Sequence, residues 1–276
     1  MDLAKLHLLI EEFKSAKKYA SKALEQDLKS LEAKKILAKV AYRNKNYNLA
    51  SIIINNIGGV DTKDSEIVNL LALLAIQKSK TSQARALFNK AIELNSRDLA
   101  ARMNLGILLM SHHQVKQAGV EFERVLRLFP ENLDAIMYSA IVDTAAGSYD
   151  KAEDKFEKVL DESPKNPIAL YNSAVMYNRM DKRDKALANL RKFLKTPMAK
   201  SSSVDEVFAL IDEIKDAKAR QGKSPITDEE VQALAKDIED ESPEDDILGS
   251  VGGEPEVVSP EEGEINDLES EIFDAH

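Results

Sequence analysis

Residues 99–132 read LAARMNLGILLMSHHQVKQAGVEFERVLRLFPEN, and this stretch decides the fold. Ala118 within it belongs to a series of alanines that recurs every 34 residues along the chain. A small residue stands twelve positions before each alanine, and a residue that is mostly large and apolar stands four positions after it. The three series are Ala16, Ala50, Ala84, Ala118, Ala152 and Ala186; Ala4, Ala38, Ala72, Gly106, Ala140 and Ala174; and Ala20, Ile54, Phe88, Phe122, Phe156 and Leu190. Six units in register without an insertion or deletion indicate a tandem repeat.

A repeat of this length with two small positions predicts helical hairpins. Small residues at two fixed places let the paired helices approach closely, and the residue four places after the alanine lies one turn further along the same helix face. A single hairpin cannot bury its apolar faces, so neighbouring hairpins must complete the core. We therefore expect an all-α chain of stacked helix pairs.

The unit at residues 99–132 resembles the tetratricopeptide repeat. Leu105 and Gly106 match the Leu-Gly pair of that family, Ala118 and Phe122 match its second helix, and Pro130 matches its closing proline. The resemblance covers roughly residues 3–198. It implies a right-handed superhelical solenoid whose concave groove binds other proteins.

Some positions depart from the family pattern. Arg102 replaces a large aromatic residue, Ser139 and Ser173 replace Leu, and Asp143 replaces Tyr, so we expect the packing of these units to differ locally. Complete units are predicted to begin at Leu31, Ser65, Leu99, Leu133 and Pro167. The first unit is truncated, and Asp2 is the predicted N-cap of its first helix.

The chain divides by composition into three segments. The repeat array is expected over residues 1–198, capping helices over 199–236, and an acidic, mostly disordered tail over 237–276. In the capping segment, helical spacing relates Val204, Val207, Phe208, Ile211 and Ile214, and a second helix is predicted with Thr227 as its N-cap.

Charge is distributed unevenly. The net charge is −10, yet residues 237–276 hold 16 acidic residues and no Lys or Arg, which leaves the body mildly basic. A body with such a tail should repel phosphate, so nucleic-acid binding is disfavoured. The chain has no Cys, no apolar run long enough to span a membrane, and no visible signal peptide. We expect a cytoplasmic protein if Met1 is the native start, and a periplasmic or cell-envelope protein if an export signal has been removed.

Within the family, the first helix of each hairpin lines the groove. Met103, Ile107 and Met110 form a stripe at i, i+4 and i+7, apart from the packing side that Leu105 and Leu109 occupy. An exposed apolar, Met-rich stripe usually marks a binding site; the alternative is that the stripe is core. With the equivalent positions of other units, the predicted partner-binding residues are Asn69, Leu73, Ile76, Met103, Ile107, Met110, Met137, Tyr138, Ile141, Tyr171 and Val175.

At its N-terminal end the groove is predicted to be basic. Lys35, Lys39 and Arg43 follow i, i+4 and i+8 along one helix, and Lys5 holds the matching place in the truncated unit. These residues predict a basic mouth to the groove, and the alternative is an ordinary solvated face.

The acidic tail carries its own pattern. Ile265, Leu268, Ile272 and Phe273 follow i, i+3, i+7 and i+8 and predict a short amphipathic helix over residues 264–273. We expect this segment to occupy the groove, in the same molecule or a neighbouring one. The alternative is a tail that only keeps the protein soluble.

The sequence contains no recognisable catalytic or metal-binding motif. His112 and His113 stand at a predicted turn without the ligand spacing of a zinc site, and no phosphate-binding loop or nucleophile motif is present. We expect no cofactor and no enzyme activity, but a scaffold that binds a peptide or amphipathic helix of another protein. The alternatives are an adaptor whose own tail occludes the groove, and a regulatory subunit of an enzyme on a separate chain. The combination also bears a faint resemblance to bacterial tetratricopeptide proteins of motility or cell-envelope machinery.

Overall fold

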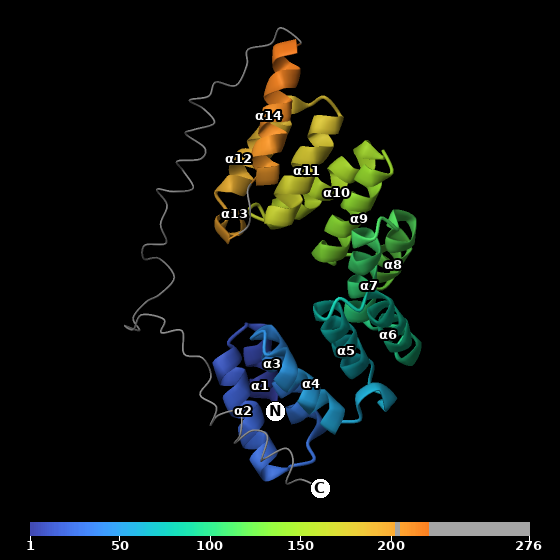
Figure 1. The fold of residues 1–276 in the computed structure, drawn as a ribbon. Coiled ribbons are helices and arrows are strands. Elements are labelled where there is room, and N and C mark those ends of the chain that lie inside the picture. The colour runs from blue at the N-terminus through green and yellow to red at the C-terminus, as the bar shows by residue number, and fades with distance from the viewer. Residues whose placement is uncertain (202–204, 221–276) are drawn as a thin grey trace, which may run out of the picture. The chain divides into compact units, whose positions relative to one another are not determined.

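The structure, a computed structural model, describes residues 1–201 and 205–220 (Figure 1). In this part of the chain every regular element is helical. The elements are α1 (Asp2–Leu9), α2 (Phe13–Gln26), α3 (Leu31–Arg43), α4 (Tyr47–Asn56), the short 3₁₀ helix η1 (Gly59–Asp61), α5 (Ser65–Gln77), α6 (Thr81–Leu94), α7 (Leu99–Ser111), α8 (Val115–Leu128), α9 (Leu133–Ala145), α10 (Tyr149–Glu162), α11 (Pro167–Arg179), α12 (Arg183–Leu194), α13 (Pro197–Ser201) and α14 (Asp205–Arg220). The helices form two compact units, of which the first ends at Leu108 within α7, and each is described by itself.

The helices pair into hairpins at the predicted period. The first helices of the complete hairpins begin at Leu31, Ser65, Leu99, Leu133 and Pro167, where the sequence places the repeat starts. The all-α class and the tandem hairpins are thereby confirmed. Helix α1 differs from the prediction, because Met1 rather than Asp2 holds its N-cap position, without a capping side chain.

Each complete first helix is capped by the residue before it. The side chains of these residues accept a hydrogen bond from the backbone N–H three residues later, at 2.8 Å for Asn132 and 3.0 Å for Asn166. Such a cap contributes about 1 kcal/mol. The caps recur at the repeat period and are Ser30, Asp64, Asp98, Asn132 and Asn166.

The turn inside each hairpin contains one residue in the left-handed backbone region. The φ angles there lie between 55° and 76°, and only one of the six residues is a glycine. The backbone N–H of the following residue reaches back to a carbonyl five residues earlier, as Asn46 does to Ala41 at 2.9 Å, which closes a Schellman motif. The left-handed residues are Glu11, Lys45, Ser79, His113, Gly147 and Asp181.

The core is built from the repeating positions. All eighteen residues of the three series quoted from the sequence are buried, and Phe88, Phe122 and Phe156 are among the largest side chains with almost no exposed surface. The first unit buries its own apolar cluster, and so does the second. The small positions therefore lie where paired helices touch, as the spacing predicted.

Polar contacts compensate for the positions that depart from the family pattern. In the second unit, Lys155 Nζ donates to Ser139 Oγ at 2.7 Å and to Asp143 Oδ2 at 2.6 Å. In the next hairpin, Asn189 Nδ2 donates to Ser173 Oγ at 2.8 Å. The Lys155–Ser139 and Asn189–Ser173 contacts each join residues sixteen apart. In both hairpins the second helix therefore supplies a polar partner for the Ser that replaces Leu on the first helix.

Helix α14 closes the described part of the second unit. Val207, Ile211 and Ile214 are buried and Phe208 is partly buried, and the helix packs on α11 and α12. The predicted spacing therefore places the correct face inward. Val204, the helix expected from Thr227 and the whole acidic tail lie outside the described residues. Among the described helices, none is long and apolar enough to cross a membrane.

Candidate functional site: the exposed faces of the first helices

The predicted basic mouth of the first unit is an ion-pair cluster. Lys35 Nζ lies 2.6 Å from Glu66 Oε2, 3.0 Å from Asp64 Oδ2 and 3.2 Å from Glu32 Oε1. Burial alone would lower the pKa of Lys35, but its hydrogen bonds to Glu66 and Asp64 outweigh burial and raise the pKa above the usual range. Lys39 shares Glu66 with it at 3.3 Å.

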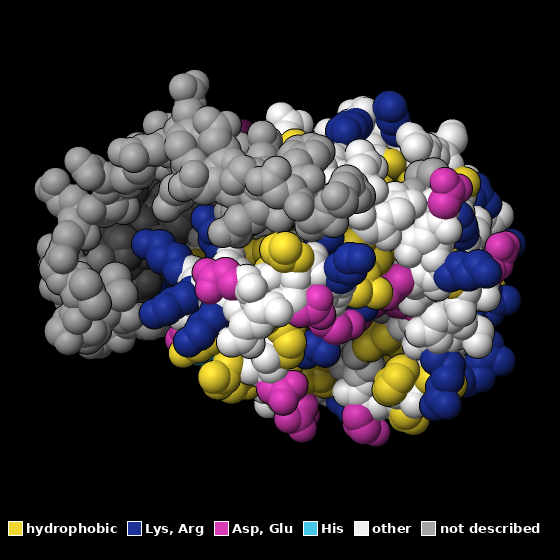
Figure 2. Space-filling model, turned by 90° about the horizontal axis from the view of Figure 1, so that it is seen from below, with side chains coloured by type: hydrophobic (Ala, Val, Ile, Leu, Met, Phe, Trp, Pro, Cys, Tyr) yellow, Lys and Arg dark blue, Asp and Glu magenta, His cyan; other side chains and the backbone are white. Residues whose placement is uncertain are grey.

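The two outer cations of this mouth are also paired. Lys5 Nζ lies 2.9 Å from Glu32 Oε2, and Arg43 Nη1 lies 3.5 Å from Glu11 Oε1. On the face shown in Figure 2, basic and acidic side chains likewise lie interspersed. The structure thus pairs every base of the predicted basic mouth with a carboxylate, so the positive charge there is largely balanced.

A hollow accompanies the ion-pair cluster. It lies between α3, α4 and α5 and is open to solvent. Apolar side chains form its wall, while Lys35, Lys39 and Glu66 stand at its polar side. The hollow is much smaller than the pockets that hold small-molecule ligands.

The apolar stripe of the first unit is partly open to solvent. Ile107 is 37% exposed, and Met103 is half-buried, while Leu105 and Gly106 on the packing side are buried. Leu73 and Ile76 of α5 are half-buried as well. The residues predicted to lie on the binding face are thus more exposed than Leu105 and Gly106, which were predicted to pack against other helices.

A hydrogen bond joins two helices on this face. Asn104 Nδ2 donates to Asn69 Oδ1 at 3.0 Å, so the side chains of α7 and α5 meet there. Arg102, which replaces an aromatic residue, is buried, and its guanidinium donates to the backbone oxygen of Ser96. Met110, at the end of the same stripe, is half-buried.

In the second unit one residue that was predicted to contact a partner lies in the core instead. Met137 is only 2% exposed and belongs to the core cluster, so it cannot contact a partner on the surface. Its repeat equivalent Met103 is half-buried, which shows that the same position is covered to different extents in different hairpins. Thr144 of the same helix is buried too, and its hydroxyl donates to the Ala140 oxygen at 2.9 Å.

The remaining predicted residues of this unit are half-buried. Tyr138 stacks on Phe122 with ring centroids 5.3 Å apart, and burial followed by the charge of Asp134 raises its pKa. The Tyr171 ring lies 5.8 Å from that of Phe193. Ile141 and Val175 share this partial exposure. The structure thus offers two aromatic side chains and two aliphatic ones on the first helices of this unit.

Sequence reasoning missed a second ion cluster. Glu153 Oε2 and Oε1 lie 2.6 and 2.7 Å from the ammonium groups of Lys182 and Lys185. Hydrogen bonds from Lys182 and then Lys185 lower the pKa of Glu153 to about 2. Lys185 also stands 5.0 Å from the Tyr177 ring centroid, and burial raises the Tyr177 pKa to about 12. These residues are not separated by the 34-residue period, so no pattern in the sequence predicts the cluster.

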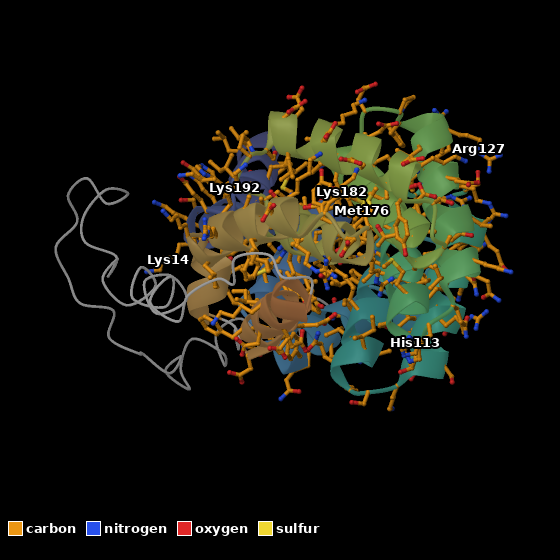
Figure 3. The ribbon with its side chains drawn as sticks, turned by 90° about the horizontal axis from the view of Figure 1, so that it is seen from above. Lys14, His113, Arg127, Met176, Lys182 and Lys192 are labelled. Atoms are coloured by element: carbon orange, nitrogen blue, oxygen red, sulfur yellow. The ribbon has the colours of Figure 1, made fainter. Side chains whose placement is uncertain are left out.

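Groups suited to metal binding are few. Among the described residues, no cluster of three His, Cys, Asp or Glu side chains could hold a metal ion. His113 occupies the left-handed position of the turn after α7, and Figure 3 labels it at the edge of the ribbon. Both His112 and His113 are exposed, as the sequence predicted for turn residues.

Comparison with known families decides what these hairpins are. A tetratricopeptide-repeat model matches residues 69–132 and 112–167, and a second tetratricopeptide-repeat model matches residues 168–196. The chain is a tetratricopeptide-repeat protein. The first two hairpins of this tetratricopeptide-repeat protein precede the matched residues, and their shared period and burial extend the repeat to them.

Solved structures show the same fold. MamA, residues 41 to the end, from Desulfovibrio magneticus RS-1 is 16% identical, with a TM-score of 0.51; the match covers 62% of this chain and 97% of that chain. YrrB, described as a tetratricopeptide-repeat protein with an unusual peptide-binding site, is 21% identical over 63% of this chain and 90% of its own, with a TM-score of 0.49. No curated protein matches the sequence. Tetratricopeptide-repeat proteins are scaffolds for protein–protein interaction, and the chain belongs to that class.

Proposed function

We propose that this protein is a non-catalytic scaffold that binds a peptide or amphipathic helix of another protein on the exposed faces of its first helices. The proposed contact residues are those predicted from the sequence, without Met137 and Lys35, which are buried. Within the first unit, the apolar members would form the dry centre of the interface, and the ion-paired Lys39 and Arg43 would form its polar rim.

One observation carries this proposal. Ile107 and Met103 remain open on α7 although the packing side of the same helix is already filled by Leu105 and Gly106. Apolar side chains that the core does not use favour contact with a partner. The thioether of Met103 adapts to irregular surfaces, which suits a peptide ligand.

The alternatives make different predictions about partners. A tail that occludes the face would be displaced by the partner, so removal of residues 237–276 would reveal additional ligands. A regulatory subunit would capture one enzyme and change its activity. A role in motility or cell-envelope assembly would appear as capture of components of those machineries.

The test compares two double variants in affinity capture from extracts of the native cell. Met103→Asp with Ile107→Asp should abolish capture and leave the helical circular-dichroism signal and cooperative unfolding unchanged, because each change places a charge on a surface that becomes dry on binding. The matched control is Val120→Asp with Leu128→Asp, which alters two exposed apolar residues of α8. Unfolding of the first variant, or equal capture by both, would contradict the proposal.

A further inference from the structure

Three lysines form a stripe on the exposed side of helix α2. Lys14, Lys18 and Lys22 follow i, i+4 and i+8, so they lie on one side of the helix (Lys14 is labelled in Figure 3). All three are exposed, and within the described part of the chain none of their ammonium groups forms an ion pair or a hydrogen bond. The only acidic residue in the sequence of α2 is Glu25. We call Lys14, Lys18 and Lys22 the lysine stripe.

The exposure of the lysine stripe is a property of the repeat. The residues that stand at multiples of 34 positions after Lys14 are all exposed, and so are those after Lys18 except the half-buried Ile52. The exposed residues are Asn48, Ser82, Lys116, Asp150 and Asp184 in the first series, and Ala86, Val120, Asp154 and Ala188 in the second. Solvent therefore reaches this side of the second helix in the later hairpins too, and the exposure does not depend on where the sequence begins.

The lysine stripe works against the stability of its own helix. Lys14 stands in the first turn of α2, where the helix dipole favours an acid, and α10 and α12 place Asp150 and Asp184 at the same position. Neighbouring lysines of the stripe are like charges one turn apart, which repel each other. In the sequence, no later second helix has a base at all three positions. Charges that do not stabilise their own helix indicate an anionic contact outside it.

We propose that the lysine stripe binds the acidic residues 237–276 of the same chain. This segment holds 16 acidic residues and no Lys or Arg, so its charge is complementary to that of the stripe. The contact differs from the groove contact predicted from the sequence. The bases of the basic mouth already have carboxylate partners, whereas those of the stripe have none among the described residues. Helix α2 contributes no residue to the proposed peptide site, so the two proposals are independent.

Covalent attachment favours this segment over an outside anion. Residues 221–276 can extend to about 190 Å, several times the length of any described helix, so the link does not prevent contact with α2. A flexible link holds an attached segment at an effective concentration of roughly 1 mM, so weak ion pairs are sufficient. A membrane or a nucleic acid would have to displace the segment, and the net charge of −10 on the chain repels both.

Energy transfer between two dyes on the full chain measures the contact. The sequence contains no Cys, so Gln26→Cys, at the exposed end of α2, and Ser270→Cys, in the acidic segment, provide the only labelling sites. Transfer should fall at least about two-fold between about 0.01 M and about 1 M salt, because the screening length falls from about 30 Å to about 3 Å. An acidic segment that makes no contact would contract as salt is added and would show the opposite change. Excess unlabelled chain should leave the transfer unchanged, because the contact lies within one molecule.

Two triple variants of the labelled chain locate the contact. The stripe variant carries Lys14→Glu, Lys18→Glu and Lys22→Glu. Its transfer at about 0.01 M salt should equal that of the wild-type chain at about 1 M salt. The control variant carries Lys116→Glu, Lys151→Glu and Lys165→Glu, at exposed lysines that likewise form no ion pair within the described residues. It changes the net charge equally and should keep the wild-type transfer, and circular dichroism should be the same for all three proteins.

Three results would overturn the proposal. They are equal transfer in the wild-type chain and the stripe variant, an equal loss in both variants, and a loss when unlabelled chain is added. A vesicle assay tests the competing occupant. Vesicles of phosphatidylcholine and phosphatidylserine should not co-sediment the wild-type chain at about 0.01 M salt. If they do, and the stripe variant abolishes this without a change in transfer, the stripe binds lipid and the proposal is wrong.

Discussion

Replacing Lys45 by Gly should stabilise the protein. Lys45 has a φ of 62°, a conformation that costs a residue with a Cβ about 1–2 kcal/mol. Glycine removes this cost but loses more chain entropy on folding, about 0.5–1 kcal/mol. The expected net gain is about 0.5–1 kcal/mol. The Lys45 side chain is exposed and the structure shows no interaction for it, so nothing else is lost.

Urea unfolding followed by circular dichroism measures this gain. Lys45→Ala is the matched control, because it removes the side chain and keeps the strained backbone, and it should change stability by less than about 0.5 kcal/mol. The triple variant with Ser79→Gly and His113→Gly should gain about 2 kcal/mol, because the three turns belong to three separate hairpins.

The reverse change tests the same reasoning. Gly147 already occupies this position with a φ of 76°, and a Cβ added there meets no atom within 4 Å. Gly147→Ala should therefore cost about 1 kcal/mol through the backbone alone. A Lys45→Gly variant no more stable than Lys45→Ala, or a Gly147→Ala variant as stable as the wild type, would refute the argument from backbone strain.

Two further predictions concern packing and charge. Ala118→Leu should destabilise the fold by about 1–3 kcal/mol in urea unfolding, because Ala118 has no exposed surface where two helices touch; a loss below about 0.5 kcal/mol would argue against the register. Glu153→Gln should cost roughly 1 kcal/mol at neutral pH, since its Lys182 and Lys185 partners are partly exposed. The folded-state pKa of Glu153 is about 2, below its usual value, so the contribution of this carboxylate is complete above about pH 5 and disappears as the pH falls towards 2. Stability curves of variant and wild type should therefore converge over that acidic window, and parallel curves would contradict the assignment.

The period in the sequence was sufficient to predict the hairpins. Because every repeat places the same position in the same environment, the helix starts and the burial of the eighteen repeating positions could be predicted from the sequence alone. The capping residues and left-handed turns follow the same period, but their residue types vary. Lys45 and His113 are not residues that a turn of this kind normally selects.

The candidate site was harder to predict because side chains from other helices decide it. Met103 and Met137 occupy equivalent positions, yet one is half-buried and the other lies in the core. The bases of α3 share a helical stripe that is visible in the sequence, but their carboxylate partners lie on α3 itself, in the turn before α5, on α5 and in the turn after α1, and only the folded chain brings them together. Periodicity identifies a face, and the neighbouring side chains determine its exposure and charge.

The uninterrupted 34-residue register limits how this protein can change in length. A segment of one full period duplicated at a boundary such as Asn166 to Pro167 would end in the same cap and begin the same helix, so the added hairpin would meet neighbours that already fit it. Loss of a single residue within a helix would instead turn every later side chain of that helix by about 100° away from its partners. Gene duplication can therefore lengthen the array only in whole hairpins, and each added hairpin brings one more first-helix face for ligands to contact.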